Sequence, residues 1–272
     1  MLRINNEIKS LYGLKWNPFS KGIPIKAIQV NSQMEDFMFQ MNVLLGEGGF
    51  AMLSGDPGLG KSTLLRCYYN RLIQDTKITP RQLTRPQSTL VDFYRELGRL
   101  FSFDLPVNSK YNSHIKLREC WLKSILDTQI IPVLMIDEAQ LIRPFLFEEL
   151  KSLSSHEFDT QNLLTILLVG DHRLSQLLSN QDLLHIGSRI RYSLSLKHYS
   201  NEYLINLLTE SLELAGAPQL MTGGLIKTLV EKAMGNPRTL FNLANQCLTE
   251  AVRKKANPID EKIFLQTNLF KK

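Results

Sequence analysis

Gly55-Asp56-Pro57-Gly58-Leu59-Gly60-Lys61-Ser62 is the stretch that decides the fold of this 272-residue chain. It fits the pattern G-x-x-x-x-G-K-[ST], in which glycines let backbone N–H groups curl around phosphates where a Cβ would clash. The apolar stretch Phe50–Ser54 before it predicts a buried strand, and a helical pattern from about Lys61 to Ile73 follows it. A strand, this loop and a helix in that order are the context that a phosphate-binding loop requires.

The residue types of this loop suit a nucleoside triphosphate with a divalent cation. A helix N-terminus favours an anion, Lys61 can reach the β- and γ-phosphates, and the Ser62 hydroxyl can ligate Mg²⁺. We therefore expect ATP and Mg²⁺ as cofactors, held by the residues Gly55, Asp56, Pro57, Gly58, Leu59, Gly60, Lys61, Ser62 and Thr63.

A second apolar stretch, Ile130–Ile136, ends in the acids Asp137 and Glu138. An acid at the carboxyl end of a parallel strand lies at the edge of the sheet where ligands bind. Asp137 is suited to holding Mg²⁺ together with Ser62, and Glu138 to polarising the attacking water as a general base.

Further apolar runs separated by helical stretches indicate an α/β fold with a parallel sheet covered on both faces. Leu163–Gly170 predicts another strand, and Ile78–Leu83 and Tyr192–Leu196 are weaker candidates. After about Ser200, apolar residues recur at helical spacing through Lys255. We expect an α/β domain over 1–199 and a small helical domain with a C-terminal tail over 200–272.

Composition excludes several classes of protein. With 43% hydrophobic and 21% charged residues, the chain is neither disordered nor fibrous. Its apolar runs fall short of the ~20 residues that span a bilayer, and three scattered cysteines indicate a reducing compartment. We therefore expect a cytoplasmic protein with no membrane partner.

Positive charge is concentrated in one part of the chain. The net charge is +6, while residues 61–123 hold twelve Lys and Arg against five Asp and Glu. Such an excess attracts polyanions, nucleic acid above all. The alternative reading is a solvated face without a ligand.

Taken together, these motifs resemble the AAA+ ATPases of the ExeA-like group, which includes the TnsC, TniB and IstB-type ATPases that regulate DNA transposition. The resemblance is carried by the phosphate-binding loop, Asp137-Glu138-Ala139-Gln140, Leu168-Val169-Gly170, Gly235-Asn236-Pro237-Arg238 and the N-terminal Tyr12–Phe19. It implies a five-stranded parallel sheet flanked by helices, a small C-terminal all-α lid, and nucleotide bound between adjacent subunits.

The resemblance also implies roles for three residues of the α/β part. Asp171 stands where a polar sensor contacts the γ-phosphate or the attacking water, although an acid departs from the usual residue there. A helix cap is an equally good reading of Asp171. Arg189 matches the arginine finger offered to a neighbour's ATP, and we favour it over Arg191, which fits a structural role on the incoming strand.

Three more residues are placed by the same resemblance. Arg238 matches the lid arginine that touches phosphate in its own subunit, with an ordinary surface arginine as the alternative. Trp16 and Phe19 would line the adenine pocket, although both also suit a hydrophobic core.

The related ATPases assemble head to tail on duplex DNA, and we expect the same homo-oligomer, ring or filament, here. Expected DNA contacts are Arg81, Arg85 and Lys110, with Gln87, Ser88 and Thr89 as polar helpers. Contacts of this kind give sequence-independent, salt-sensitive binding. The expected function is regulation of DNA transposition through a separate transposase. The alternatives are a fragment of an ExeA-type secretion ATPase and a helicase loader or replication initiator.

Overall fold

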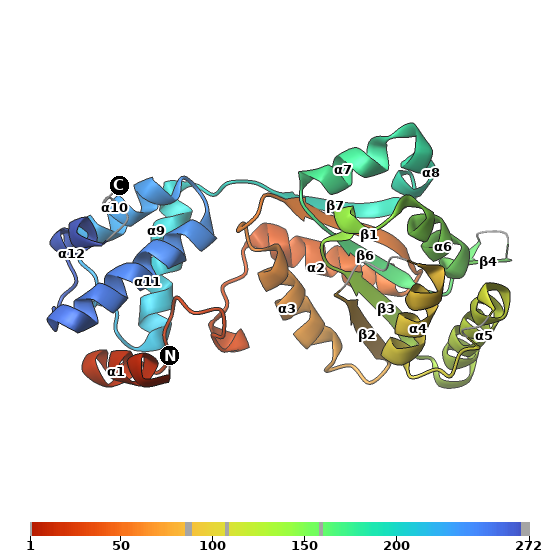
Figure 1. Ribbon diagram of the computed structural model, residues 1–272, viewed down its shortest axis with the longest axis horizontal. Helices are drawn as coiled ribbons and strands as arrows, with labels where there is room; N and C mark the ends of the chain where they lie inside the picture. The colour runs from red at the N-terminus through yellow and green to blue at the C-terminus, as the bar shows by residue number, and fades with distance from the viewer. Residues whose placement is uncertain (1, 85–88, 107–108, 158–159, 268–272) are drawn as a thin grey trace. The chain divides into compact units, whose positions relative to one another are not determined.

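The computed structural model describes residues 2–84, 89–106, 109–157 and 160–267 of the chain. Contacts divide them into two units, shown in Figure 1. Unit 1 comprises residues 1–29, 58–60 and 197–272, and unit 2 comprises residues 30–57 and 61–196. Each unit has its own hydrophobic core.

Unit 2 is built on a five-stranded parallel sheet with the strand order β2-β3-β6-β1-β7. The strands are β1 (Gly49–Gly55), β2 (Ile78–Leu83), β3 (Ile131–Ile136), β6 (Thr165–Val169) and β7 (Ile190–Leu196). This confirms the predicted five-stranded α/β fold, including the two strands with the weaker sequence signals. Central strands read as continuous apolar runs because helices cover both faces of a parallel sheet, and β6 is buried at every position.

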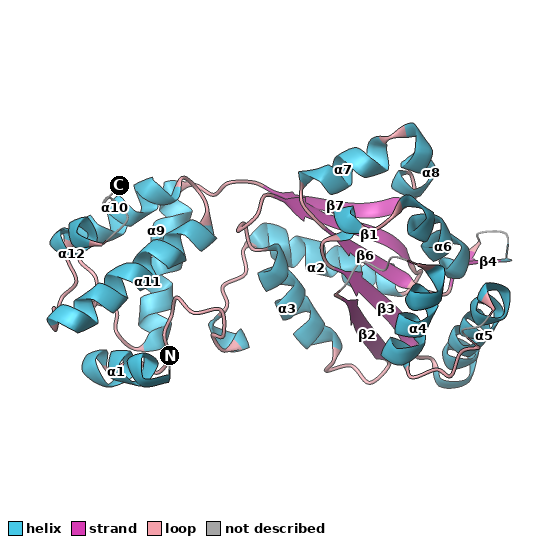
Figure 2. Ribbon diagram, viewed as in Figure 1, coloured by secondary structure: helices cyan, strands magenta, loops and turns pink. Residues whose placement is uncertain are grey.

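Helices flank this sheet, as Figure 2 shows. They are α2 (Ser32–Leu45), α3 (Lys61–Leu72), α4 (Leu90–Phe101), α5 (Lys110–Thr128), α6 (Pro144–Ser154), α7 (His172–Ser179) and α8 (Leu184–Gly187). Several begin at a side chain that accepts a backbone N–H of the first turn, as Asn31, Thr89 and Ser109 do. Such caps fix where a helix starts because the first N–H groups have no partner within the helix.

A small antiparallel hairpin was not expected from the sequence. Its strands are β4 (Ser155–His156) and β5 (Gln161–Asn162), with the register pairs Ser155–Asn162 and His156–Gln161. Strands of two residues are too short for hydrophobic periodicity to reveal them.

Unit 1 is helical. It contains α1 (Leu2–Tyr12), the 3-10 turn η1 (Ile25–Ala27), α9 (Asn201–Ala215), α10 (Gly223–Ala233), α11 (Pro237–Lys254) and α12 (Glu261–Gln266). A C-terminal helical region was therefore predicted correctly.

The N-terminal segment joins this helical unit rather than the α/β unit. Ile8, Tyr12, Leu14 and Phe19 are buried in the same core as the leucines of α9, α10 and α11, and the Tyr12 hydroxyl donates to the Ala256 carbonyl at 2.9 Å. Residues 1–29 thus group differently from the predicted division at residue 199. A short segment has no sequence signal that tells which of two cores its few apolar side chains enter.

Across the ranges that the structure describes, no helix is both long enough and apolar enough to cross a bilayer.

Candidate functional site

The phosphate-binding loop follows β1 and leads into α3. Gly55, Gly58 and Gly60 have φ angles of +147°, +94° and +106°, which lie in the region that glycine alone adopts without strain. At Gly55 a Cβ would also stand 2.8 Å from the Leu196 carbonyl oxygen of β7. The loop can therefore present its backbone N–H groups to an anion, as the sequence predicts.

Lys61 is the first residue of α3 and is only 8% exposed. Its ammonium donates to the carbonyl oxygens of Gly55, at 2.6 Å, and Asp56, at 3.1 Å. A buried ammonium needs hydrogen-bonding partners, and these two carbonyls hold it against the loop. The charge of Lys61 therefore lies where phosphates would bind.

The candidate Mg²⁺ ligands are Ser62, on the first turn of α3, and Asp137, directly after β3. Asp137 is half-buried, and burial raises the pKa of its carboxyl group, against the lowering effects of the Glu138 N–H and of Lys61. A bound cation would stabilise the ionised carboxylate against this burial. Carboxylate oxygens are also the ligands that Mg²⁺ prefers. These residues fit Mg²⁺ held jointly by a carboxylate, a hydroxyl and nucleotide phosphates. No cluster of three or more His, Cys, Asp or Glu among the described residues forms a separate metal site.

Glu138 has an unusual backbone. Its φ and ψ of 53° and 39° are left-handed, which is uncommon for a residue other than glycine and is concentrated at functional sites. The turn is held by its N–H, which donates to the Asp137 carboxylate at 2.9 Å. The Glu138 side chain is exposed and accepts a hydrogen bond from the Gln140 amide nitrogen at 2.6 Å. Sequence reasoning gave Gln140 no role.

Asp171 caps the N-terminus of α7, as one of the two predictions for this residue expected. Its carboxylate accepts the Arg173 N–H at 2.9 Å and forms an ion pair with the Arg173 guanidinium at 2.6 Å. The hydrogen bonds from Arg173 lower the pKa of Asp171 despite its burial. Asp171 also lies 3.5 Å from the Gln140 amide nitrogen. Arg173 has no signal in the sequence, because a charge two residues past a cap is common on any surface helix.

Arg189 and Arg191 differ in their surroundings. Arg189 lies between α8 and β7, with its N–H donating to the Ile186 carbonyl at 3.0 Å. The guanidinium of Arg191 pairs with Glu47, so it ties the start of β7 to the end of α2. That pairing agrees with a structural Arg191, and the role of Arg189 as the finger stays a prediction.

Arg238 lies at the start of α11 in unit 1 and is exposed. Its N–H donates to the Asn236 side chain at 3.0 Å and to the Gly58 carbonyl at 3.3 Å. Gly58 belongs to the same unit by contacts. The role of the Arg238 side chain stays a prediction.

The two candidate adenine-pocket aromatics lie in unit 1. Phe19 is buried and stacks on Phe241 with ring centroids 6.0 Å apart, and Trp16 packs on the same helical core. Both aromatics thus pack in a hydrophobic core, which was the alternative to an adenine pocket.

The expected DNA contacts have partners within the chain wherever the structure describes them. The Arg81 guanidinium, on the edge strand β2, donates to the carbonyls of Leu100 and Pro80. Thr89 caps α4, and the Lys110 ammonium pairs with Glu149 at 3.0 Å. Arg85, Gln87 and Ser88 lie outside the described residues.

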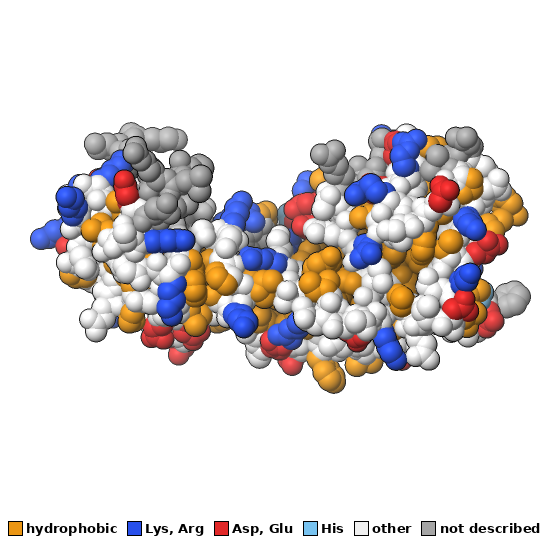
Figure 3. Space-filling view, turned by 90° about the horizontal axis from the view of Figure 1, so that it is seen from below, with side chains coloured by type: hydrophobic (Ala, Val, Ile, Leu, Met, Phe, Trp, Pro, Cys, Tyr) orange, Lys and Arg blue, Asp and Glu red, His pale blue; other side chains and the backbone are white. Residues whose placement is uncertain are grey.

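Part of the positive charge between residues 61 and 123 is paired. Arg71 pairs with Glu35 at 2.6 Å, Arg95 with Asp92 at 2.7 Å, and Arg99 with Glu96 at 2.5 Å. Figure 3 shows Lys and Arg scattered among acids and apolar side chains on the face that it displays. Asp92 and Glu96 are already counted in the net charge of the segment, while Glu35 lies outside it, so the pair with Glu35 lowers the positive charge at this surface below the count from the sequence.

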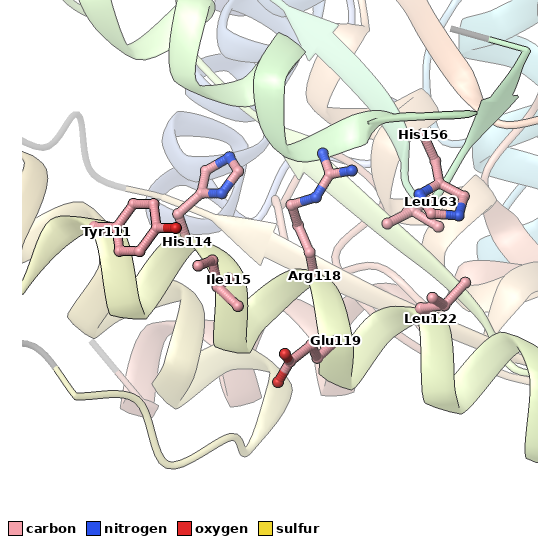
Figure 4. Close-up of a pocket in the computed structure, with 8 residues that line it drawn as sticks. All are labelled: Tyr111, His114, Ile115, Arg118, Glu119, Leu122, His156 and Leu163. Carbon is pink, nitrogen blue, oxygen red and sulfur yellow. The ribbon is translucent and has the colours of Figure 1, made fainter. Parts of the chain in front are cut away.

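A surface hollow of about 410 Å³ lies along α5, at the β4–β5 hairpin (Figure 4). Arg118 and His114 point to the same side of α5. The Arg118 guanidinium donates to the Ser152 carbonyl, and the His114 Nε2 lies 3.0 Å from the Ser152 hydroxyl oxygen. Burial lowers the pKa of His114. The remaining lining is mostly apolar, from Ile115, Leu122 and Leu163, and none of the predicted site residues belongs to this hollow.

Comparison with known proteins agrees with this geometry. Residues 45–178 match the family described as AAA domain. The chain is 26% identical over 250 residues to general secretion pathway protein A of Aeromonas hydrophila, covering 91% of this chain and 45% of that protein. It thus spans less than half the length of that relative.

Two solved structures share the fold. Cdc6p of Pyrobaculum aerophilum has a TM-score of 0.70 at 16% identity, and the match covers 89% of this chain and 67% of the Cdc6p chain. ORC1 of Aeropyrum pernix, solved in complex with DNA, has a TM-score of 0.68 at 16% identity, with 90% and 67% covered. With its phosphate-binding loop after β1 and its acids after β3, this chain matches the AAA domain family over residues 45–178, and it is similar in sequence to the secretion protein and in fold to the Cdc6 and ORC proteins.

Proposed function

We propose that this chain is an ATP-dependent, sequence-nonspecific DNA-binding ATPase that oligomerises on duplex DNA. There it would regulate transposition by recruiting or activating a transposase at the target site. One observation carries the ATPase part: the buried Lys61 ammonium at the end of β1 and the Asp137-Glu138 pair after β3 lie at the same edge of one parallel sheet. Ligands bind at the carboxyl edge of such sheets.

Within this proposal each residue has a defined task. The N–H groups of residues 55–63 and Lys61 bind the phosphates, and Ser62 and Asp137 hold Mg²⁺, which neutralises charge on the β- and γ-phosphates when bound. Glu138 accepts a proton from the attacking water and orients it. Arg238 would add a contact to phosphate from the lid.

The proposed role of Arg189 requires oligomerisation. An arginine finger acts on the ATP of the adjacent subunit, so each site is complete only when two copies meet. ATP would then favour assembly, and hydrolysis would favour release.

DNA binding is supported by the fold shared with ORC1, which was solved in complex with DNA, and by the surplus of Lys and Arg. The proposed contacts remain Arg81, Arg85, Gln87, Ser88, Thr89 and Lys110. Since Arg81 and Lys110 now have partners within the chain, DNA would have to compete for their charges.

A second candidate function is a motor for secretion, favoured by the 26% identity with general secretion pathway protein A. The fold shared with Cdc6p equally suits a replication initiator or helicase loader. The three candidates share the ATPase site and differ in what the ATP-bound state engages.

Gel retardation of a duplex of unrelated sequence separates the DNA-binding candidates from the secretion motor. We expect retardation with a non-hydrolysable ATP analogue, none with ADP, and a steep loss of binding as salt rises. Lys61→Ala should abolish the shift, and Glu138→Gln should keep it while blocking turnover. Absence of a shift at low salt in a chain that binds the analogue would refute the DNA part and favour the secretion motor.

The transposition part needs a separate measurement. Strand transfer by a transposase that co-purifies with the chain should increase when the chain is loaded on target DNA with ATP. Recovery of a helicase in place of a transposase would favour the loader or initiator.

A further inference from the structure

Gln140 joins the candidate general base to the start of α7. Its side-chain nitrogen lies 2.6 Å from a Glu138 carboxylate oxygen and 3.5 Å from an Asp171 carboxylate oxygen. Its side-chain carbonyl accepts the Asp171 N–H at 3.3 Å. One amide thus contacts segments that follow two neighbouring strands, β3 and β6.

The fold makes room for this amide. A Cβ on Gly170 would stand 2.4 Å from the Gln140 side-chain oxygen, well inside van der Waals contact. Gly170 has no positive φ that would by itself demand glycine. A Cβ there would also stand 2.9 Å from the Leu174 Cβ. The absence of a side chain at Gly170 therefore leaves room for both Gln140 and Leu174.

Asp171 is engaged by Arg173 on both of its oxygens. The Arg173 Nε lies 3.1 Å and 2.9 Å from the two oxygens, and its Nη2 lies 2.6 Å from the second. With the residue 8% exposed, these bonds hold the carboxylate in one orientation. Asp171 is thus arranged as a fixed support rather than as a group that moves toward a substrate.

Glu138, in contrast, is exposed. Its carboxylate accepts the hydrogen bond from Gln140 at 2.6 Å and lies within the electrostatic field of the Arg173 guanidinium. A general base has to be held within a fraction of an ångström of its water, since a misplacement of about 1 Å costs on the order of a hundredfold in rate. Gln140 supplies the contact that restricts it.

We propose that Gln140 is a positioning residue that holds the Glu138 carboxylate in place for catalysis, and that Asp171 and Arg173 act through Gln140 and not on the attacking water. The proposal rests on the proposed ATP hydrolysis for its kinetic consequence, but the contact itself exists without nucleotide. Two kinds of measurement therefore test it.

The first measurement is the side-chain amide NMR signal of Gln140 in the nucleotide-free chain, assigned by its loss in Gln140→Met. Glu138→Ala and Gly170→Ala should each shift that signal, while the signal of the exposed Gln74 should stay in place. An unmoved Gln140 signal in both variants would overturn the proposed contact, whether or not the chain hydrolyses ATP.

The second measurement is ATP turnover. Gln140→Met keeps the length of the side chain and removes the amide, so kcat should fall about ten- to a hundredfold while nucleotide affinity is retained. Gln140→Asn keeps the amide on a shorter stem and should be intermediate. Gly170→Ala should imitate Gln140→Met, and Gln74→Met is the matched control with wild-type kcat.

A double variant tests whether Gln140 acts through Glu138. In a Glu138→Gln background, Gln140→Met should cause no further loss of the residual rate, because residues that act as a unit are not additive. An equal loss in both backgrounds, a parallel loss of nucleotide affinity, or an unchanged kcat in Gln140→Met would overturn the proposal. A wild-type chain that binds ATP without turnover would instead refute the proposed hydrolysis and leave the NMR result to decide the contact.

Discussion

Replacement of Lys61 by methionine separates nucleotide binding from folding. The ammonium is 8% exposed and bonds to the Gly55 and Asp56 carbonyls at 2.6 Å and 3.1 Å. Methionine has a similar length and no charge, so both the cost of burying the charge and its two hydrogen bonds disappear together. Methionine leaves the two carbonyl oxygens without this donor, which costs about 1–3 kcal/mol, but it also removes the penalty of burying a charge. Because these effects oppose each other, the free energy of unfolding without nucleotide should change by no more than about 1 kcal/mol.

Affinity for ATP should change far more. A hydrogen bond to a charged group contributes about 1.5–3 kcal/mol, and each 1.4 kcal/mol is about tenfold in Kd. Loss of the Lys61 contact with phosphate should therefore weaken ATP binding roughly 10- to 150-fold.

Titration with a fluorescent ATP analogue gives the affinity, and urea denaturation followed by circular dichroism gives the stability. Lys123→Met, at an exposed position of α5, is the matched control and should alter neither quantity. Two results would refute the reasoning: wild-type affinity in Lys61→Met, or a fall of more than about 2 kcal/mol in its unfolding free energy.

Two further predictions concern groups outside the nucleotide site. Burial raises the pKa of the Cys247 thiol to about 12. A disulfide reagent at about pH 8 should therefore leave Cys247 unmodified in the native chain and react first with the less buried Cys120. Mass spectrometry of the labelled chain locates the label, and rapid labelling of Cys247 would contradict its burial. Burial also lowers the pKa of His114 below 6.5. Between that lowered pKa and 6.5, the unfolded chain binds a proton at His114 that the folded chain does not bind. The free energy of unfolding should therefore fall as the pH drops from 6.5 toward the folded-state pKa. Urea midpoints at about pH 7 and about pH 5.5 should therefore differ less in His114→Gln than in the wild type, and an NMR titration midpoint of His114 at or above 6.5 would contradict this account.

Local signals in the sequence predicted the elements that carry the nucleotide site. The loop from Gly55 to Ser62 has its glycines where φ is positive, and the acids after Ile130–Ile136 fall at the end of β3. Both signals work because phosphate binding constrains neighbouring residues of one chain segment. The central strands β1, β3 and β6 were likewise predictable, because strands covered on both faces are continuous apolar runs, whereas the edge strands β2 and β7 had weaker signals.

Contacts between distant segments had no such signal. The chain alone does not reveal that the amide of Gln140 meets Asp171, 31 residues further on. Nor does it reveal that Arg71 pairs with Glu35, which removes part of the basic excess that favoured a polyanion.

The sequence by itself therefore determined the fold class and predicted a phosphate-binding loop, because both depend on residue type and spacing within short segments. Tertiary structure decided which residues surround Glu138, which core receives the N-terminal segment, and how much of the charge between residues 61 and 123 is paired. These depend on distances through space, which are set only when strands and helices pack, and that is why the contact of Gln140 with Asp171 is visible only in the folded chain.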